Sequence, residues 1–232
     1  MMKAKKHGPW MLVSLLAVLL TAPARGGEIL DRIVATVNGQ IILQSDWQDA
    51  LQYEALMSAR PLDQFSAAER KASLDRLIDQ ELLREQMRSS DAPRATDAQI
   101  AQRLAEIRKL YPGTDSQEAW LRLLASHGFT EDQLKQRIGL QIELLGLVDA
   151  RLRPSVNIDT ASIESYYNRE LLPQLRQQGA SEVPLADVTP KIRELLTQEK
   201  VSELLVAWLQ NLRADSDIHT GANPAGSPDE TR

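Results

Sequence analysis

Few residues in this chain could carry out chemistry, and their spacing favours no reaction. The chain has no cysteine and three histidines, His7, His127 and His219. No second histidine lies three or four positions from any of them, the spacing that places two imidazoles on one helix face to bind a metal. His127 precedes Gly128, and a helix C-terminus explains an imidazole at such a position. We therefore expect no catalytic residue, no cofactor-binding residue and no metal ligand.

The short motifs of common enzyme classes are also absent. The sequence contains no G-x-S-x-G, no P-loop and no G-x-G-x-x-G pattern, which mark nucleophiles and nucleotide sites. The acidic residues within 75–79 and 81–85 lie beside Arg76, Arg84 and Arg88. Such mixed charges are typical of the solvated face of a helix. We predict a binding protein rather than an enzyme.

The first 24 residues have the layout of a secretory signal peptide. Lys3, Lys5 and Lys6 precede the apolar stretch Trp10–Leu20, and Thr21–Ala24 offers a small-residue cleavage site. The alternative is an uncleaved membrane anchor. This stretch of eleven residues, all apolar except Ser14, rises only about 16 Å as a helix, against a hydrocarbon core of roughly 30 Å. We expect cleavage, a periplasmic location and no stable membrane insertion afterwards.

Charge restricts the class of partner. The net charge is −5, and removal of the three leader lysines makes it more negative. An acidic chain without a basic stripe is a poor ligand for nucleic acid or for an anionic membrane. Partners should therefore be recognised through apolar or backbone contacts.

The elements that must form the binding surface begin with a hairpin. The β-branched stretches Ile33–Val37 and Gln40–Leu43 flank Asn38-Gly39, the preferred pair for a two-residue turn. Two strands alone are marginally stable, so we expect Ser216–Thr220 to pair with them as a third strand.

Helices are predicted for most of the remaining chain. Five capping residues are followed three positions later by Glu or Gln, a pattern of helix starts: Ser45/Gln48, Ser66/Glu69, Thr96/Gln99, Asp115/Glu118 and Thr130/Gln133. A sixth helix is expected over 159–176, bent or ended by Pro173. The last helix should begin near Asp187 or Thr189.

The helix expected over 130–153 is apolar around nearly its whole circumference. Such a helix is usually buried on most sides, and the alternative is that part of it lines an apolar groove. The fold class is therefore mainly α, with a helical core over 25–220. Its two parts span 28–176 and 185–220, and a disordered tail follows over 221–232.

Both ends of the chain resemble the SurA family of periplasmic chaperones. The family's apolar spacing is matched near the N-terminus, in the helix after Ser66 and near the C-terminus: Ile29, Leu30, Asp31, Arg32, Ile33, Ala35, Val37, Asn38, Ser45, Asp46; Leu77, Ile78, Leu82, Leu83; Ile192, Leu195, Leu196, Lys200, Trp208, Leu212. The family often carries parvulin-type prolyl isomerase domains, but here the short stretch Gln177–Pro184 stands in their place. The chain thus resembles the chaperone core without its isomerase.

The resemblance implies an ATP-independent chaperone that binds unfolded exported proteins, above all outer-membrane proteins, through an apolar groove. Our candidate client-binding residues are Leu140, Leu144, Leu147, Trp120 and Phe129. Two alternatives stay open. One is a scaffold or assembly factor with a single fixed partner, and the other is a degenerate or partnered peptidyl-prolyl isomerase.

Overall fold

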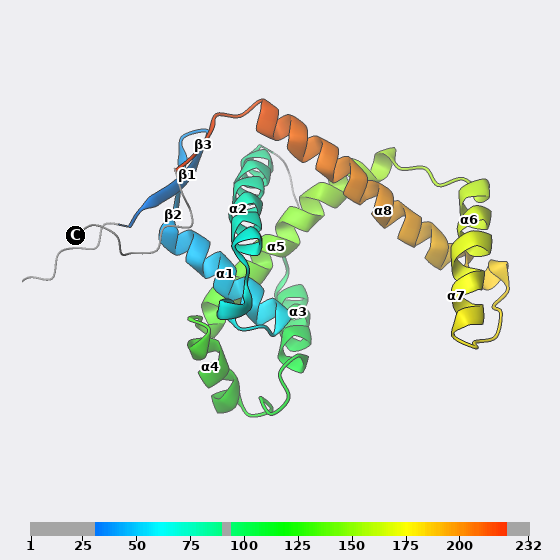
Figure 1. The fold of residues 1–232 in the computed structure, drawn as a ribbon, viewed down its shortest axis with the longest axis horizontal. Coiled ribbons are helices and arrows are strands. Elements are labelled where there is room, and N and C mark those ends of the chain that lie inside the picture. Colours follow the sequence, from blue (N-terminus) through cyan, green and yellow to red (C-terminus); the bar gives the residue numbers. More distant parts are fainter. Residues whose placement is uncertain (1–30, 90–93, 222–232) are drawn as a thin grey trace, which may run out of the picture. The chain divides into compact units, whose positions relative to one another are not determined.

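The computed structural model describes residues 31–89 and 94–221 (Figure 1). The expected signal peptide over 1–24 and the expected tail after residue 221 lie outside the described residues. Within them the fold is mainly α-helical with one small antiparallel sheet. The predicted fold class is confirmed. Among the described helices, none has an apolar stretch of the length that a membrane crossing requires.

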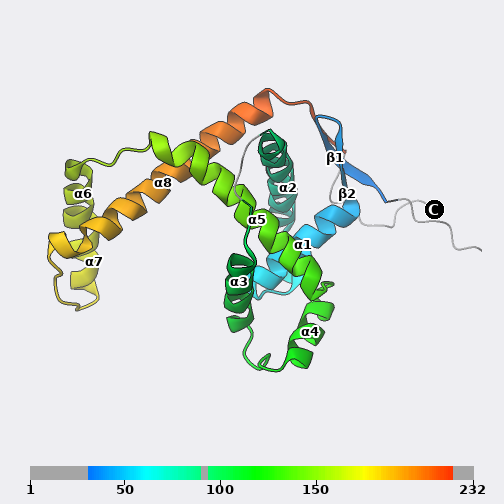
Figure 2. The same cartoon turned by 180° about the vertical axis from the view of Figure 1, so that it is seen from behind.

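The helices follow the hairpin in a single run (Figures 1 and 2). They are α1 (Gln44–Ser58), α2 (Ala67–Arg88), α3 (Asp97–Lys109), α4 (Gln117–Ser126), α5 (Glu131–Leu152), α6 (Thr160–Tyr166), α7 (Leu172–Gln177) and α8 (Leu185–Ala214). A π-helical segment, Tyr167–Leu171, joins α6 to α7.

The three-stranded sheet joins the beginning of the described chain to its end. Strands β1 (Ile33–Val37) and β2 (Gln40–Leu43) form the predicted hairpin, and β3 (Ile218–Thr220) pairs antiparallel with β1. The order is β2-β1-β3. At the turn, Asn38 has φ 48° and Gly39 has φ 82°, as a type I′ turn requires. Both the hairpin and the pairing with the C-terminal strand are confirmed.

Three of the five predicted helix caps are confirmed. The side chains of Ser66, Thr96 and Thr130 each accept a hydrogen bond from the third helical N–H. The prediction for Ser45 is wrong because β2 runs directly into α1. Leu43 is the capping residue there, and its N–H donates to the Asp46 carboxylate at 2.8 Å.

One further cap and one boundary differ from the prediction, and one of the two outcomes expected at Pro173 is not seen. Ser116, not Asp115, caps α4. Pro173 does not end its helix, because the segment before it widens and the N–H of Leu172 donates to the carbonyl of Tyr167, five residues back. Helix α8 starts at Leu185 and tolerates Pro190 in its second turn.

Apolar side chains gather in three clusters. The first lies between the sheet, α1 and α2, and includes Trp47, whose indole N–H donates to the Arg70 carbonyl at 3.0 Å. The second joins α1, α3, α4 and α5 around Trp120. The third joins α2, α5 and α8, where Leu83, Leu144 and Val148 meet the last helix. Helices α1, α2 and α5 each contribute to two clusters or more, so they form the framework of the fold.

A polar contact fixes the end of α8 to α2. Arg213 Nε donates to an Asp79 carboxylate oxygen at 2.6 Å, and Arg213 Nη2 donates to the Asp75 carbonyl at 2.8 Å. The carboxylate of Asp79 raises the pKa of Arg213. This contact and the β1–β3 pairing hold the C-terminal part of the described chain against its beginning.

Candidate functional site

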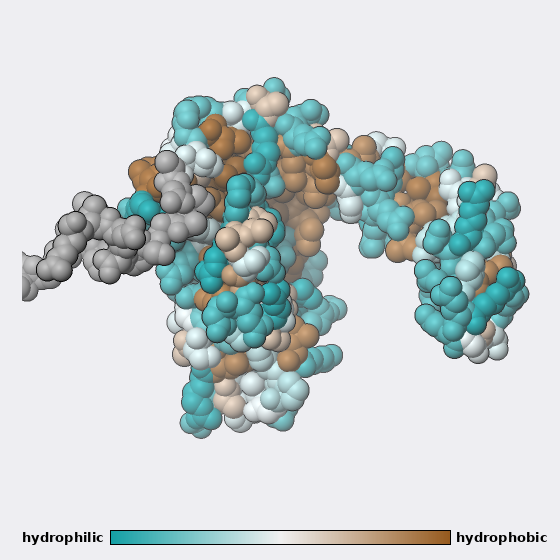
Figure 3. Space-filling view, in the orientation of Figure 1, coloured by the Kyte–Doolittle hydropathy of each residue, from teal (hydrophilic) through white to brown (hydrophobic). Residues whose placement is uncertain are grey.

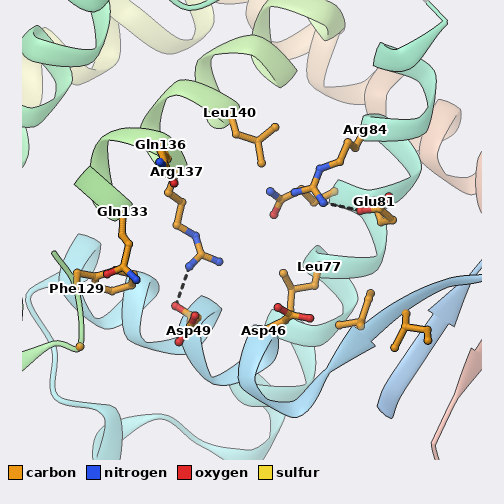
Figure 4. Close-up of a pocket in the computed structure, with 14 residues that line it drawn as sticks. Asp46, Asp49, Leu77, Glu81, Arg84, Phe129, Gln133, Gln136, Arg137 and Leu140 are labelled. Carbon is orange, nitrogen blue, oxygen red and sulfur yellow. Dashed lines mark hydrogen bonds and ion pairs between the residues drawn. The ribbon is translucent and has the colours of Figure 1, made fainter. Parts of the chain in front are cut away.

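A hollow lies between strand β2 and helices α1, α2 and α5, and we call it the strand-side hollow (Figure 4). Its volume is about 370 Å³. Residues far apart in the sequence line it: Ile41, Ile42, Asp46, Asp49, Leu77, Gln80, Glu81, Arg84, Gly128, Phe129, Gln133, Gln136, Arg137 and Leu140. Strand β2, helices α1, α2 and α5, and the glycine after α4 therefore all help to shape it.

The walls of this hollow are partly apolar. Leu77 from α2 and Leu140 from α5 extend into it from opposite sides in Figure 4. Ile41 lies at its edge with 55% of its surface exposed. A large exposed apolar side chain beside an open hollow is a common feature of surfaces that bind other chains.

Arg137 brings a positive charge into the strand-side hollow. Its Nη1 donates to the carbonyl of Asp49 at 3.1 Å, and its guanidinium lies 5.0 Å from the ring centroid of Tyr53. Burial lowers the pKa of Arg137, the carboxylates of Asp49 and Glu54 oppose that shift, and the group stays charged. Among the described residues no carboxylate lies within ion-pair distance of it. Its remaining donors are therefore not matched by an acid.

A carboxylate on the other side of the hollow is already neutralised. Glu81 is 9% exposed and accepts hydrogen bonds from Arg84 at 2.7 Å and from Arg88 at 2.8 Å. Both carboxylate oxygens of Glu81 are therefore occupied by arginine side chains. We infer that this pairing stabilises α2 and the wall of the hollow.

A second hollow, the helix-side hollow, has a volume of about 470 Å³. It shares Leu77, Gln80 and Arg137 with the first, and is bounded by α1, α2, α5 and α8. Its apolar lining includes Ala50, Met57, Leu83, Leu144 and Leu209. Figure 3 shows apolar surface in the recess beside α2 and α5. The two hollows together offer apolar contacts on both sides of the α2–α5 packing.

The structure separates the five candidate client-binding residues. Leu140 and Phe129 line the strand-side hollow and Leu144 lines the helix-side hollow. Leu147 is buried in α5 and lines neither of them. Trp120 has no exposed surface and belongs to the second core cluster, and it borders a further hollow of about 540 Å³ beside α3. In this structure, Leu140, Leu144 and Phe129 are therefore the better placed candidates.

Sequence reasoning missed Ile41, Leu77 and Arg137 as lining residues. The available signal for Arg137 was a charged residue directly before the apolar run that starts at Ile138. No sequence signal places Ile41 at the strand-side hollow, because its position there depends on how β2, α1 and α5 pack.

The described residues show no cluster that would hold a metal ion: they contain no group of three or more histidine, cysteine or acidic side chains suited to it. His127 caps α4 and its Nδ1 lies 3.0 Å from the Leu123 carbonyl oxygen. The arrangement is suited to contact with another polypeptide.

Comparison with known proteins gives one family match and one curated relative. The SurA-like N-terminal domain family matches residues 1–147. Chaperone SurA of Chromobacterium violaceum is 24% identical over 200 residues, a match that covers 84% of this chain and 44% of that relative. The chain thus spans less than half the length of this curated relative.

Proposed function

Because the chain belongs to the family of SurA-like N-terminal domains, we propose that it is a periplasmic chaperone that holds unfolded exported proteins without using ATP. Outer-membrane proteins are the class of client that we expect. The observation that carries the proposal is the pair of open, partly apolar hollows on either side of the α2–α5 packing.

The hollows suit transient holding rather than tight storage. Their volumes, about 370 and 470 Å³, are each sufficient for a few side chains and not for a folded domain. An unfolded client loses conformational entropy on binding, so it gains little affinity from each contact and is released readily. We expect the apolar side chains of the two hollows to supply most of the binding free energy, so holding should weaken little between low and high salt.

The proposal does not include prolyl isomerisation. Seven residues, 178–184, connect α7 to α8, where relatives with an isomerase would carry a domain of roughly one hundred residues. The Tyr167 hydroxyl donates to the Val183 carbonyl at 2.7 Å, and this bond holds the end of the connection against the π-helical segment. A client would therefore be bound and released unchanged.

The test is light scattering by a β-barrel precursor diluted from urea, with and without equimolar protein comprising residues 25–232. We expect the protein to reduce scattering and to leave a proline-limited refolding phase at its uncatalysed rate. Unreduced scattering would contradict the chaperone proposal. A faster slow phase at substoichiometric protein would favour the isomerase alternative.

A panel of unrelated unfolded clients separates the remaining alternative. A holding chaperone should protect several of them, because apolar contacts discriminate weakly between sequences. Protection of one protein alone would favour a scaffold or assembly factor with a fixed partner.

A further inference from the structure

We propose that an extended polypeptide segment binds by adding a strand to the free edge of β2, with one of its apolar side chains in the strand-side hollow. This inference rests on the proposed function and specifies how the client backbone is recognised.

The register of the sheet shows which backbone groups are available. Asn38 N donates to the Asp217 carbonyl and Gly221 N donates to the Val34 carbonyl, both at 2.9 Å. Even-numbered residues of β1 therefore direct their backbone groups toward β3, and Val37 and Ala35 direct theirs toward β2.

Thr36 is even-numbered and lies opposite Ile41, so this pair is not hydrogen-bonded. The N–H and the carbonyl of Ile41 consequently point away from β1, toward the outer edge of the sheet. Among the described residues no hydrogen bond is made by either group. An extended chain needs such a donor and acceptor on one residue to extend a sheet.

The free edge and the strand-side hollow are continuous. Ile41 and Ile42 both line the hollow, and Leu77 and Leu140 lie across it. A segment hydrogen-bonded to Ile41 would therefore cross the mouth of the hollow, with alternate side chains directed into it and away from it. The opposite edge of the sheet differs, because no residue of β3 lines either hollow.

The available edge is short. The N–H of Leu43 donates to Asp46, and Gln40 adjoins the turn. One residue therefore offers both of its backbone groups, and the added strand would be held by few hydrogen bonds. Short edges of this kind limit uncontrolled pairing between chains. They also suit a client that must be released.

The first experiment measures anisotropy of a fluorescein-labelled eight-residue peptide with alternating valine and threonine. A second peptide of the same sequence is N-methylated at alternate residues along the edge that would face β2, and a third along the other edge. Methylation of the facing edge should weaken binding roughly tenfold, since it removes hydrogen bonds, and methylation of the other edge should have little effect. Equal binding of all three peptides would overturn strand addition.

The second experiment removes the donor from the protein. Ile41→Pro deletes an N–H that faces away from β1, so the hairpin ladder is kept, and proline is tolerated at such edge positions. Thr220→Pro is the matched control, because Thr220 lies on β3 in a pair of the same kind. Ile41→Ala keeps the N–H and removes apolar contact. Circular dichroism establishes that each variant is folded.

We expect Ile41→Pro to weaken binding of the unmethylated peptide and to abolish the difference between the methylated peptides. Thr220→Pro should retain that difference. Should Ile41→Pro unfold the chain, the methylated peptides on the unaltered protein still decide the matter. Suppressed scattering with no effect of methylation would refute strand addition and leave the chaperone proposal intact.

Discussion

Asn38 and Asp217 are joined by two hydrogen bonds in opposite directions. The backbone N–H of Asn38 donates to the Asp217 carbonyl at 2.9 Å, and the N–H of Asp217 donates to the Asn38 side-chain oxygen at 2.9 Å. The side-chain amide of Asn38 also donates to the Glu85 carboxylate at 2.7 Å and to the Ser216 hydroxyl at 3.1 Å. One residue of the hairpin turn thus contacts α2 and the segment between α8 and β3.

Replacing Asn38 should destabilise the protein more than a surface change would. Asn38→Gly keeps the left-handed backbone conformation and loses the side-chain bonds, which we expect to cost about 1–2 kcal/mol. Asn38→Ala also strains a residue with φ 48° and should cost about 1 kcal/mol more. Urea denaturation measures both, and equal stability of the two variants would show that the turn conformation is unimportant.

Truncation tests the closure of the chain. Deletion of residues 215–232 removes β3 and should lower the thermal midpoint by several degrees, because β1 loses one neighbour. Deletion of 222–232 leaves β3 intact and should leave the midpoint unchanged. If both truncated proteins have the same thermal midpoint as the longer chain, the β1–β3 pairing does not stabilise the fold.

Two buried tryptophans should respond differently to the same substitution. Trp120 is fully buried and its indole N–H makes no hydrogen bond of standard geometry among the described residues, although it lies near enough to the Glu131 carboxylate to help lower the pKa of that group. The indole of Trp47, by contrast, donates to the Arg70 carbonyl at 3.0 Å. We expect Trp47→Phe to destabilise by about 1 kcal/mol more than Trp120→Phe, since only the former breaks a hydrogen bond of standard geometry. Chemical denaturation gives the comparison, and the reverse order would contradict the assigned geometry.

Trp120→Ala distinguishes core packing from client contact. A truncated core tryptophan typically costs about 3–5 kcal/mol, so this variant should lose much of its stability. Unchanged stability together with weakened holding would show that Trp120 contacts the client instead.

Leu140 and Leu145 provide a matched pair on α5. Leu140 lines the strand-side hollow, and Leu145 is 60% exposed and lines neither of the two hollows described above. Leu140→Gln should reduce the suppression of scattering because it places an amide in the apolar wall, and Leu145→Gln should not. Equal loss in both variants would indicate that exposed apolar surface, rather than the hollow, determines holding.

The lowered pKa of Glu69 predicts that the stability of the protein depends on pH. The backbone N–H of Ser66 lowers the Glu69 pKa from 4.5 to about 2, with further contributions from hydrogen bonds of Arg60 and the Ser66 hydroxyl. A lowered pKa in the folded state gives stability that is present above 4.5 and is lost as the pH falls toward 2.

Glu69→Gln removes this dependence and keeps a side chain that can cap, as Gln133 does for Thr130. The variant should be less stable than the original protein at pH 7, and the difference should shrink between about pH 4.5 and 2. A difference that is constant with pH would show that the charge contributes nothing.

The sequence indicates the local elements better than the spaces between them. Asn38-Gly39 fixed the hairpin bounds because its backbone conformation is locally encoded. Ser45 failed as a cap, since the pattern does not reveal that β2 continues into α1. The hollow was predicted only as apolar surface on 130–153 together with Trp120 and Phe129, because the positions of Ile41 and Leu77 beside it depend on tertiary packing.

The position of β1 in the middle of the sheet has a consequence during synthesis. Its partner β2 is made at once, but β3 is among the last segments of the described chain to leave the ribosome. Within the described chain, one side of β1 therefore stays without its partner strand until residues 218–220 have been made, and an unpaired strand edge invites other chains. A nascent or prematurely terminated copy that lacks β3 therefore exposes an unpaired edge of β1 and is prone to associate with other chains. Pairing with β3 removes that edge.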